Sequence, residues 1–436
     1  MAGARLPRRR AFPAVVLAVL LGLSPVDVPG QEAPPLEPPA PPAEDISVYL
    51  LTMGPGDAVW EVFGHNAIWI RDPRTGTDLA YNWGMFSFDQ PGFLPRLAQG
   101  TMLYWMAGYP ADDMIRSYAA ANRDVWAQEL RLTPRQRLDL VALLQETDTD
   151  ANRFYTYDYY RDNCSTRVRD ALDTVLGGRL RETTQGVPTG VTWRWQAQRL
   201  LQAIPAAYAG MHLLLGSPSD EPIDRWQEDF LPLELMKHVR GVTVPDAQGN
   251  QVPLVLQEYQ VIDAGRPPAP EAPPFWLPWF LAAGLAVAAL LILATMTAAR
   301  GGKGAALARG CAGALAGTWS LIAGAAGLLL VAAWLFTDHV FWFWNENLLQ
   351  TSPLSLALLV PCALLVVGRP VGRVGVVLAL LVLAVSLLGF ALQALPWVDQ
   401  VNGEVIAFAL PVHAAVAWTA WRLGDQPRGG AARAAR

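Results

Sequence analysis

One cysteine in the polar part of the chain has the sequence context of a catalytic nucleophile. Two of the three cysteines, Cys311 and Cys362, lie inside long apolar runs. The third, Cys164, follows a good N-cap residue, Asn163, and precedes an apolar stripe at helical spacing. Cys164 should therefore occupy the first turn of a helix, where backbone N–H groups and the helix dipole favour a thiolate and can hold an oxyanion. A small residue packed beside the cap is the alternative interpretation.

A thiol mechanism needs a base, and His65 is the best-placed histidine in the polar domain. The other two are His212, in an apolar helical run, and His238. His65 follows Gly64 and begins an alternating run typical of a strand, so its imidazole can project from one face. Cys-His pairs are usually built from residues distant in sequence. The alternative is a histidine held at a strand edge without a chemical role.

Further polar residues complete the predicted site. Asn82 ends a neighbouring strand-like run and is our candidate for the residue that orients His65. We expect Asn163, Ser165 and Arg167, which flank the cysteine, to contact substrate. Paired metal-ligand spacings and glycine-rich phosphate loops are absent from the sequence, so we predict neither a metal nor a cofactor.

A second polar group lies in residues 337–347, where aromatic and polar side chains alternate. The aromatic residues alone are typical of a membrane-interface belt. His339, Asn345 and Asn347 are harder to explain in that way, because polar groups at the mouth of a helix bundle can bind a lipid headgroup or a lipidated terminus. We therefore include these three as predicted substrate-binding residues.

The elements that must position Cys164 and His65 can be placed from local patterns. Apolar and β-branched runs predict strands at residues 46–52, 67–70 and 79–83. Caps and helical periodicity predict helices at residues 111–122, 133–147 and 164–176. Together they indicate one α+β domain over residues 45–265, long enough for a sizeable core.

The segments before and after this domain differ from it in composition. Residues 1–30 hold a basic stretch and an apolar core, which predicts a signal peptide or an N-terminal anchor. Residues 31–44 form a Pro-rich spacer, and residues 266–274 form a Pro-rich linker.

The last third of the chain predicts a membrane domain over residues 275–422. Hydrophobic residues make up 52% of the chain, and the last third holds five apolar segments, each near the ~20 residues that a spanning helix needs. These are residues 275–298, 311–336, 348–368, 375–395 and 405–421.

Flanking charges predict the orientation of these segments. Lys and Arg gather in two of the connecting loops and in a basic tail at residues 423–436, which belong in the cytoplasm. We therefore predict a multi-pass protein of the bacterial inner membrane with its α+β domain in the periplasm. A net charge of −5 gives no basic field for nucleic acid, which we exclude as a partner.

Three short motifs carry a family resemblance: Phe63-Gly64-His65, Tyr81-Asn82-Trp83-Gly84 and Asp162-Asn163-Cys164-Ser165-Thr166. With the segments at residues 215–220, 230–232 and 339–347, they resemble the Lnb-type lipoprotein N-acyltransferase family. The order of a histidine first and an Asn-Cys pair later is also similar to the permuted papain-like fold of NlpC-type hydrolases and lecithin:retinol acyltransferases. The expected fold is therefore an α+β papain-like exported domain followed by an all-α transmembrane bundle of about five helices.

The resemblance implies a thioester acyltransferase. A membrane phospholipid would donate a fatty acyl group, and the acceptor would be the N-terminal amine of a diacylglyceryl-modified cysteine on exported lipoproteins. Cys164 would be the nucleophile and His65 the base. Three alternatives stay open: an NlpC-type hydrolase of peptidoglycan peptides, a phospholipase that releases free fatty acid, and a non-enzymatic membrane scaffold or lipid-binding module.

Overall fold

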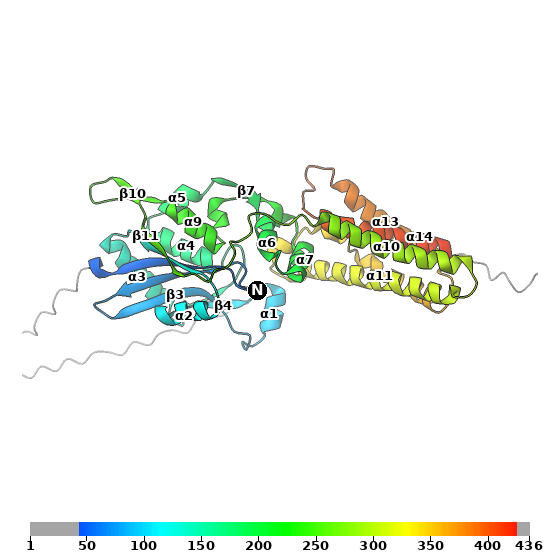
Figure 1. Ribbon diagram of the computed structural model, residues 1–436, viewed down its shortest axis with the longest axis horizontal. Helices are drawn as coiled ribbons and strands as arrows, with labels where there is room; N and C mark the ends of the chain where they lie inside the picture. Colours follow the sequence, from blue (N-terminus) through cyan, green and yellow to red (C-terminus); the bar gives the residue numbers. More distant parts are fainter. Residues whose placement is uncertain (1–42, 425–436) are drawn as a thin grey trace, which may run out of the picture. The chain divides into compact units, whose positions relative to one another are not determined.

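A seven-stranded antiparallel sheet forms the centre of the N-terminal region (Figure 1). The computed structural model describes residues 43–424, so the expected signal or anchor at 1–30, most of the spacer and most of the basic tail lie outside the described residues. The strand order is β11-β5-β1-β2-β3-β4-β6. The strands are β1 (Ser47–Met53), β2 (His65–Asp72), β3 (Thr77–Met85), β4 (Leu103–Pro110), β5 (Val125–Leu130), β6 (Phe154–Thr156) and β11 (Val255–Ile262).

Helices cover both faces of this sheet, so the inner strand β1 is buried on both sides. Val48 and Leu50 point into one core with α3 (Pro134–Thr147), α4 (Cys164–Val175) and α9 (Pro232–Arg240). Tyr49 and Leu51 point into the opposite core with α2 (Ala111–Ala120). The period of two along the strand thus separates two apolar layers. The α/β character of this region is confirmed.

The predicted strands and helices of this region correspond to β1, β2, β3, α2, α3 and α4, with ends displaced by a few residues. Thr133 caps α3 with a capping box to Gln136, as the local sequence indicates. The smaller elements complete the region: α1 (Phe93–Gln99), α5 (Arg179–Thr184), β7 (Pro188–Thr192), α6 (Trp193–Leu201), α7 (Pro205–Leu214), β8 (Pro222–Asp224), α8 (Arg225–Glu228), β9 (Thr243–Pro245) and β10 (Gln251–Pro253).

Four long helices of the C-terminal region are apolar and long enough to cross a membrane. They are α10 (Leu277–Arg300), α11 (Ala305–Phe336), α13 (Gly372–Leu392) and α14 (Gly403–Gly424). The third apolar segment is different. It consists of the 3-10 helices η4 (Glu346–Leu349) and η5 (Pro353–Leu358) followed by α12 (Leu359–Val366), with a bend of 45° at the break. The described residues therefore contain four helices that could span a membrane, or five spans if the broken segment counts as one.

The broken segment runs antiparallel along α11. Thr351 O lies against Gly327, Leu356 lies against Gly324, and Cys362 O lies against Gly313. A Cβ at Gly327 would overlap Thr351 O, and one at Gly313 would come within 2.7 Å of Cys362 O. Glycines thus allow the close backbone approach that is common between membrane helices. The contacts extend from Gly313 to Gly327 of α11, or about 21 Å, so the segment follows its neighbour over this length.

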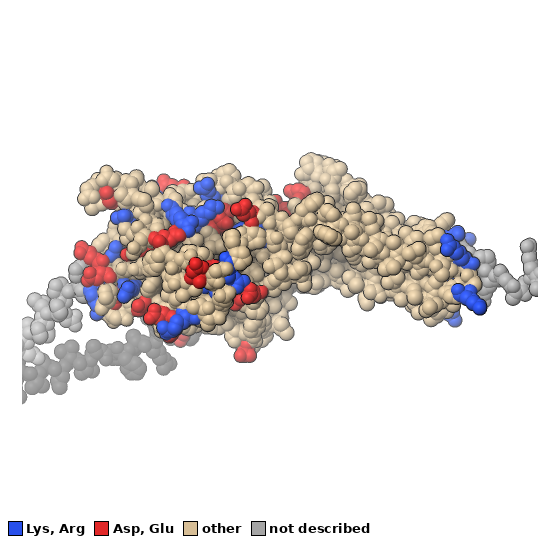
Figure 2. Space-filling view, viewed as in Figure 1, with Lys and Arg blue, Asp and Glu red and all other residues tan. Residues whose placement is uncertain are grey.

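Basic side chains gather at one end of the helical region (Figure 2). Between its two ends, the face shown carries no charged side chains. They lie in or near the connection of α10 to α11, in or near the connection of α12 to α13, and near the end of α14. The residues are Arg300, Lys303, Arg309, Arg369, Arg373 and Arg422. The structure therefore places the basic loops of the predicted topology at the same end of the bundle.

Candidate active site

Cys164 is the first residue of α4, and its helix is capped as the sequence indicates. Asn163 is extended, and its Oδ1 accepts hydrogen bonds from the N–H groups of Ser165 and Thr166, both at 2.9 Å. Because the cap engages these two N–H groups, they are not free for an oxyanion. The N–H groups of Asn66, Ser165 and Cys164 all lie against the sulfur. Because the cap holds that of Ser165, those of Asn66 and Cys164 remain for an oxyanion.

The start of β2 brings His65 to the same place. Pairing between β2 and β3 begins only at Ile68 and Tyr81, which leaves the first residues of β2 without a partner on that side. The N-terminus of α4 occupies the gap, where the Asn66 N–H lies against the Cys164 sulfur and Ser165 Oγ lies 2.8 Å from Asn66 Oδ1. The structure thus joins the strand of the histidine to the helix of the cysteine.

Asn82 fixes the tautomer of His65. Its Oδ1 lies 3.0 Å from His65 Nε2, while its Nδ2 donates to Ala80 O at 2.9 Å. The second bond sets the orientation of the amide, so only an acceptor faces the imidazole. His65 Nε2 must then carry the proton, which leaves the lone pair of Nδ1 able to accept one.

Gly84 makes room for the cysteine. The pairing of β3 with β4 is irregular between Asn82 and Met85, and Gly84 has a φ of 87°. A Cβ at this position would lie 3.2 Å from the Cβ of Cys164. A side chain at position 84 is therefore opposed by both the backbone conformation and the space available.

Two residues that the sequence analysis did not select lie beside the pair. The ring of Tyr118 stacks on His65 at 6.2 Å between centroids, and the Arg123 guanidinium lies 4.7 Å from the centre of the Tyr118 ring. Arg123 is buried and donates through Nε to Gly54 O at 2.9 Å, while its Nη2 has no hydrogen-bond partner among the described residues. A single arginine after a helix has no local signal that separates it from surface arginines.

Burial favours the neutral forms of Cys164 and His65. It raises the pKa of the Cys164 thiol to about 11, against the opposing effect of the Asn66 N–H. It lowers the pKa of His65 to about 4, and the positive charge of Arg123 lowers it further, whereas the bond to Asn82 acts against the shift. The backbone N–H groups at the helix N-terminus lower the pKa of the thiol, in the direction that the sequence indicates, but the loss of hydration has the larger effect.

This protonation state predicts the alkylation behaviour of Cys164. At pH 8 a thiol with a pKa of about 11 is only about 0.1% ionised, whereas an ordinary cysteine is roughly a quarter ionised. Alkylation by iodoacetamide should therefore be slow and should keep rising up to about pH 10.5. Intact-mass spectrometry of a variant carrying Cys311→Ala and Cys362→Ala measures the rate, with an unstructured cysteine peptide as reference. An alkylation rate that reaches a plateau below pH 9 would contradict a pKa of about 11 for Cys164.

The three predicted substrate contacts that flank Cys164 have partners within the protein. Asn163 Nδ2 donates to Tyr159 O and Phe230 O. Ser165 is fully buried. Arg167 pairs with Asp162 and lies over the ring of Tyr155. We assign these residues to positioning of the cysteine helix, and a direct contact with substrate stays a prediction.

The hydrogen bonds described for His339, Asn345 and Asn347 do not involve Cys164. Asn345 Nδ2 donates to Leu213 O at 2.9 Å and Leu214 O at 2.8 Å, and Asn347 Nδ2 donates to Leu213 O at 3.0 Å. These carbonyls belong to the last turn of α7, where no intrahelical donor is available. The two asparagines thus join the loop of the membrane helices to α7. His339 Nε2 lies 2.9 Å from Leu97 O of α1.

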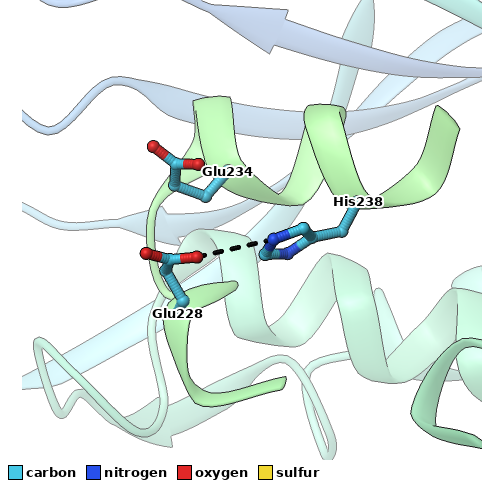
Figure 3. Close-up of side chains that lie close together, drawn as sticks. All are labelled: Glu228, Glu234 and His238. Carbon is cyan, nitrogen blue, oxygen red and sulfur yellow. Dashed lines mark ion pairs between the residues drawn. The ribbon is translucent and has the colours of Figure 1, made fainter. Parts of the chain in front are cut away.

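One group of metal-ligating side chains lies close together in the described part of the chain: Glu228, Glu234 and His238 (Figure 3), with ligand atoms within 4.8 Å of one another. His238 lies between Glu228, at 3.4 Å, and Asp229, at 2.7 Å. Glu234 already pairs with Arg199 and Lys237. Because the side chains of Arg199, Lys237 and His238 already lie next to these carboxylates, we interpret the group as an ion-pair network. It holds Asp229, whose backbone oxygen lies 2.6 Å from Ser165 Oγ.

Comparison with known proteins assigns the part of the chain that contains this site. Residues 41–199 match the family model described as the Lnb N-terminal periplasmic domain. Comparisons with curated proteins and with solved structures gave no match. The matched range includes His65, Asn82 and Cys164 and ends within α6, before the helical region. The part of the chain that carries the candidate site is therefore similar to the Lnb N-terminal periplasmic domain, as the sequence motifs indicate.

Proposed function

We propose that this protein is a membrane-bound thiol acyltransferase of exported lipoproteins, with Cys164 as nucleophile and His65 as base. The observation that carries the proposal is the junction of α4 and β2, where the Cys164 sulfur meets the Asn66 N–H beside a histidine whose tautomer Asn82 sets. The match of residues 41–199 to the Lnb N-terminal periplasmic domain and the long apolar helices in the same chain support it.

The first half-reaction transfers an acyl group from a phospholipid to the enzyme. The Cys164 thiol gives its proton to His65 Nδ1 as sulfur attacks the ester carbonyl, so a C–S bond forms and the carbonyl oxygen becomes negative. The N–H groups of Asn66 and Cys164, which lie against the sulfur, would stabilise this oxyanion. When it collapses, the ester C–O bond breaks, and the leaving oxygen takes the proton from His65. A thioester and a lysophospholipid result.

The second half-reaction transfers the acyl group to the acceptor. The N-terminal amine of a diacylglyceryl-modified cysteine attacks the thioester and loses a proton to His65. The C–S bond then breaks, the amide forms, and the sulfur recovers its proton from the imidazolium. A thioester suits this step because it is more reactive toward amines than the parent ester. An apolar site limits competing hydrolysis by water.

The arrangement of the fold supports the same proposal. A helix that begins with the cysteine packs on an antiparallel sheet whose histidine comes earlier in the sequence, the order expected of a permuted papain-like fold. We propose that the protein lies in a bacterial inner membrane. The basic end of the bundle would face the cytoplasm, and the α/β domain would lie in the periplasm. Phospholipid and exported lipoproteins are the partners, and this chemistry uses no cofactor.

Product analysis of the wild-type protein tests the proposal. Purified protein is incubated with phospholipid vesicles and a diacylated lipopeptide that has a free N-terminal amine, and the products are identified by mass spectrometry. We expect the lipopeptide to gain one acyl group in amide linkage, with one lysophospholipid formed for each amide. Without the acceptor, the protein itself should gain an acyl mass that hydroxylamine removes.

Each alternative function gives a different product in this experiment. Free fatty acid without amide indicates a phospholipase, and release of muropeptides from added peptidoglycan indicates an NlpC-type hydrolase. Lipid binding without any turnover indicates a scaffold. Any of these results, with folded protein and an unchanged lipopeptide, would overturn the acyltransferase assignment.

A further inference from the structure

An apolar surface of the α/β region lies open just beyond β3, whose Gly84 lies against Cys164. Trp60 is 63% exposed, and Leu94 of α1 is 72% exposed. Rings connect the parts of this surface, because Phe88 lies 6.1 Å from Trp60 and 5.1 Å from Phe93 between centroids. Folded soluble proteins seldom expose connected apolar patches of this kind without a binding role. We call it the entrance surface and define it by Val59, Trp60, Phe88, Leu94 and Leu97.

Helix α1 (Phe93–Gln99) exposes its apolar residues instead of burying them. No residue of α1 is buried, although three of its seven residues are Phe or Leu. Glycines with left-handed backbone, Gly92 and Gly100, bound the helix at both ends. A short helix that packs so little of its apolar surface inside the protein needs another apolar environment to cover it.

Contacts with the helical region place α1 at the end of α11. The Asp338 N–H donates to Gln99 O at 2.7 Å, and His339 Nε2 lies 2.9 Å from Leu97 O. Helix α11 is long and apolar, and it ends at Phe336, which is highly exposed. The membrane boundary on this side of the bundle therefore lies near residue 336, and α1 is fastened two residues beyond it.

A row of aromatic rings leads from the entrance surface towards the sulfur. Phe86 lies 5.0 Å from Phe88 and 5.2 Å from Tyr104, and Tyr104 stacks on Tyr157 at 4.1 Å. Phe86 is two residues beyond Gly84, where a Cβ would lie 3.2 Å from the Cβ of Cys164, so the row begins near the cysteine. The side chains that connect the entrance surface with the region of Cys164 are therefore largely aromatic.

We propose that the entrance surface inserts into the outer edge of the lipid bilayer and admits one acyl chain, which reaches Cys164 along Phe86, Tyr104 and Tyr157. An acyl chain fits better than a partner protein because the surface adjoins the end of a membrane helix. The single charge of α1, Arg96, lies on an exposed position from which it can reach lipid phosphates. The passage of a donor chain rests on the proposed function, but insertion into lipid does not.

Depth-dependent quenching tests the insertion without any need for activity. A fluorophore is attached to Leu94→Cys in a protein that carries Cys164→Ala, Cys311→Ala and Cys362→Ala and is reconstituted into phospholipid vesicles. Leu138→Cys on α3 is the matched control, because Leu138 is also an exposed leucine, at 50%. Brominated lipid should quench the label at position 94 at least about twofold more than the label at 138, and aqueous iodide should show the reverse order. Equal quenching at the two positions would overturn the proposal.

Kinetics in the active protein test the passage of the chain. Leu94→Glu with Leu97→Glu should lower acyl transfer from vesicles by at least about tenfold, or ~1.4 kcal/mol, whereas Leu138→Glu should leave it unchanged. The rate of Cys164 alkylation by iodoacetamide should stay the same in all three proteins, which controls for damage to the site. An unchanged transfer rate in the double variant would refute the passage. If the wild type itself transfers nothing, the proposed function fails while the quenching result still stands.

Discussion

Replacing Cys164 by alanine or serine will reduce acyl transfer by about 10⁴-fold or more, the scale seen when a nucleophile is removed from a site that acts as a unit. Serine is not expected to substitute, because its hydroxyl is a much weaker acid than the thiol. The partner base is also weak, since burial holds the pKa of His65 at about 4. Rates of lipopeptide amide formation, measured by mass spectrometry, give the effect.

The same assay separates the other members of the site. His65→Ala should lower the rate by about 10²–10⁴-fold, the usual range for a general base. Asn82→Ala should have a smaller effect, because it frees the tautomer of His65 without removing the base. Cys311→Ala, an exposed cysteine of α11, is the matched control and should retain full activity. A serine variant with more than about 1% of wild-type activity would be incompatible with a thioester mechanism.

Replacing Arg194 by leucine will destabilise the protein by about 3–5 kcal/mol, because it leaves a buried carboxylate without its partner. Arg194 is 1% exposed. Its Nε lies 2.8 Å from Asp220 Oδ1, and its Nη groups donate to the carbonyls of His212, Leu215 and Gly216. These carbonyls lie at the end of α7 and just beyond it, where the loop of the membrane helices attaches.

The loss should also weaken that attachment. The Gly216 N–H donates to Phe341 O at 2.7 Å, and a Cβ at Gly216 would overlap Phe343 O, so the backbones meet without intervening side chains. We expect the thermal unfolding midpoint in detergent to fall by about 10 °C. Arg194→Lys should rescue little, since one ammonium cannot replace a planar group with several fixed donors.

A matched control is available in a surface ion pair. Arg135 pairs with Asp139 across one turn of α3, and its side chain is 84% exposed. Arg135→Leu should change stability by no more than about 0.5 kcal/mol. Equal midpoints for the two leucine variants would mean that the buried arginine contributes no more than a solvated one.

Local patterns determined most of the elements that carry the site. The cap at Asn163 and the position of Cys164 in the first helical turn follow from neighbouring residues, because capping is a short-range interaction. Strand alternation likewise indicates where β2 and His65 begin. The four long apolar helices follow from composition, since a bilayer core demands about 20 apolar residues.

The third apolar segment shows where composition is not sufficient. Residues 348–368 are apolar enough for a span, yet the chain breaks at Ser352 and Pro353, where Ser352 caps a new 3-10 helix. Proline and its preceding residue disfavour a continuous helix. The packing of this broken segment depends on glycines of α11 that are far away in the sequence.

The role of the loop at residues 337–347 likewise depends on distant parts of the chain. Its polar residues could be recognised in the sequence as unusual for a membrane boundary. That Asn345 and Asn347 bind the end of α7 follows only from the fold, because their partners are backbone carbonyls that carry no side-chain signal.

The sequence by itself determined that this chain has one nucleophile-like cysteine at a helix start, a histidine at a strand start and a membrane domain with basic loops. Only the tertiary structure decided that the first residues of β2 meet the helix of Cys164, that Arg123 and Tyr118 lie beside the pair, and that thiol and imidazole are both neutral. Capping and periodicity are set by near neighbours, whereas a pKa depends on how much water the whole fold removes.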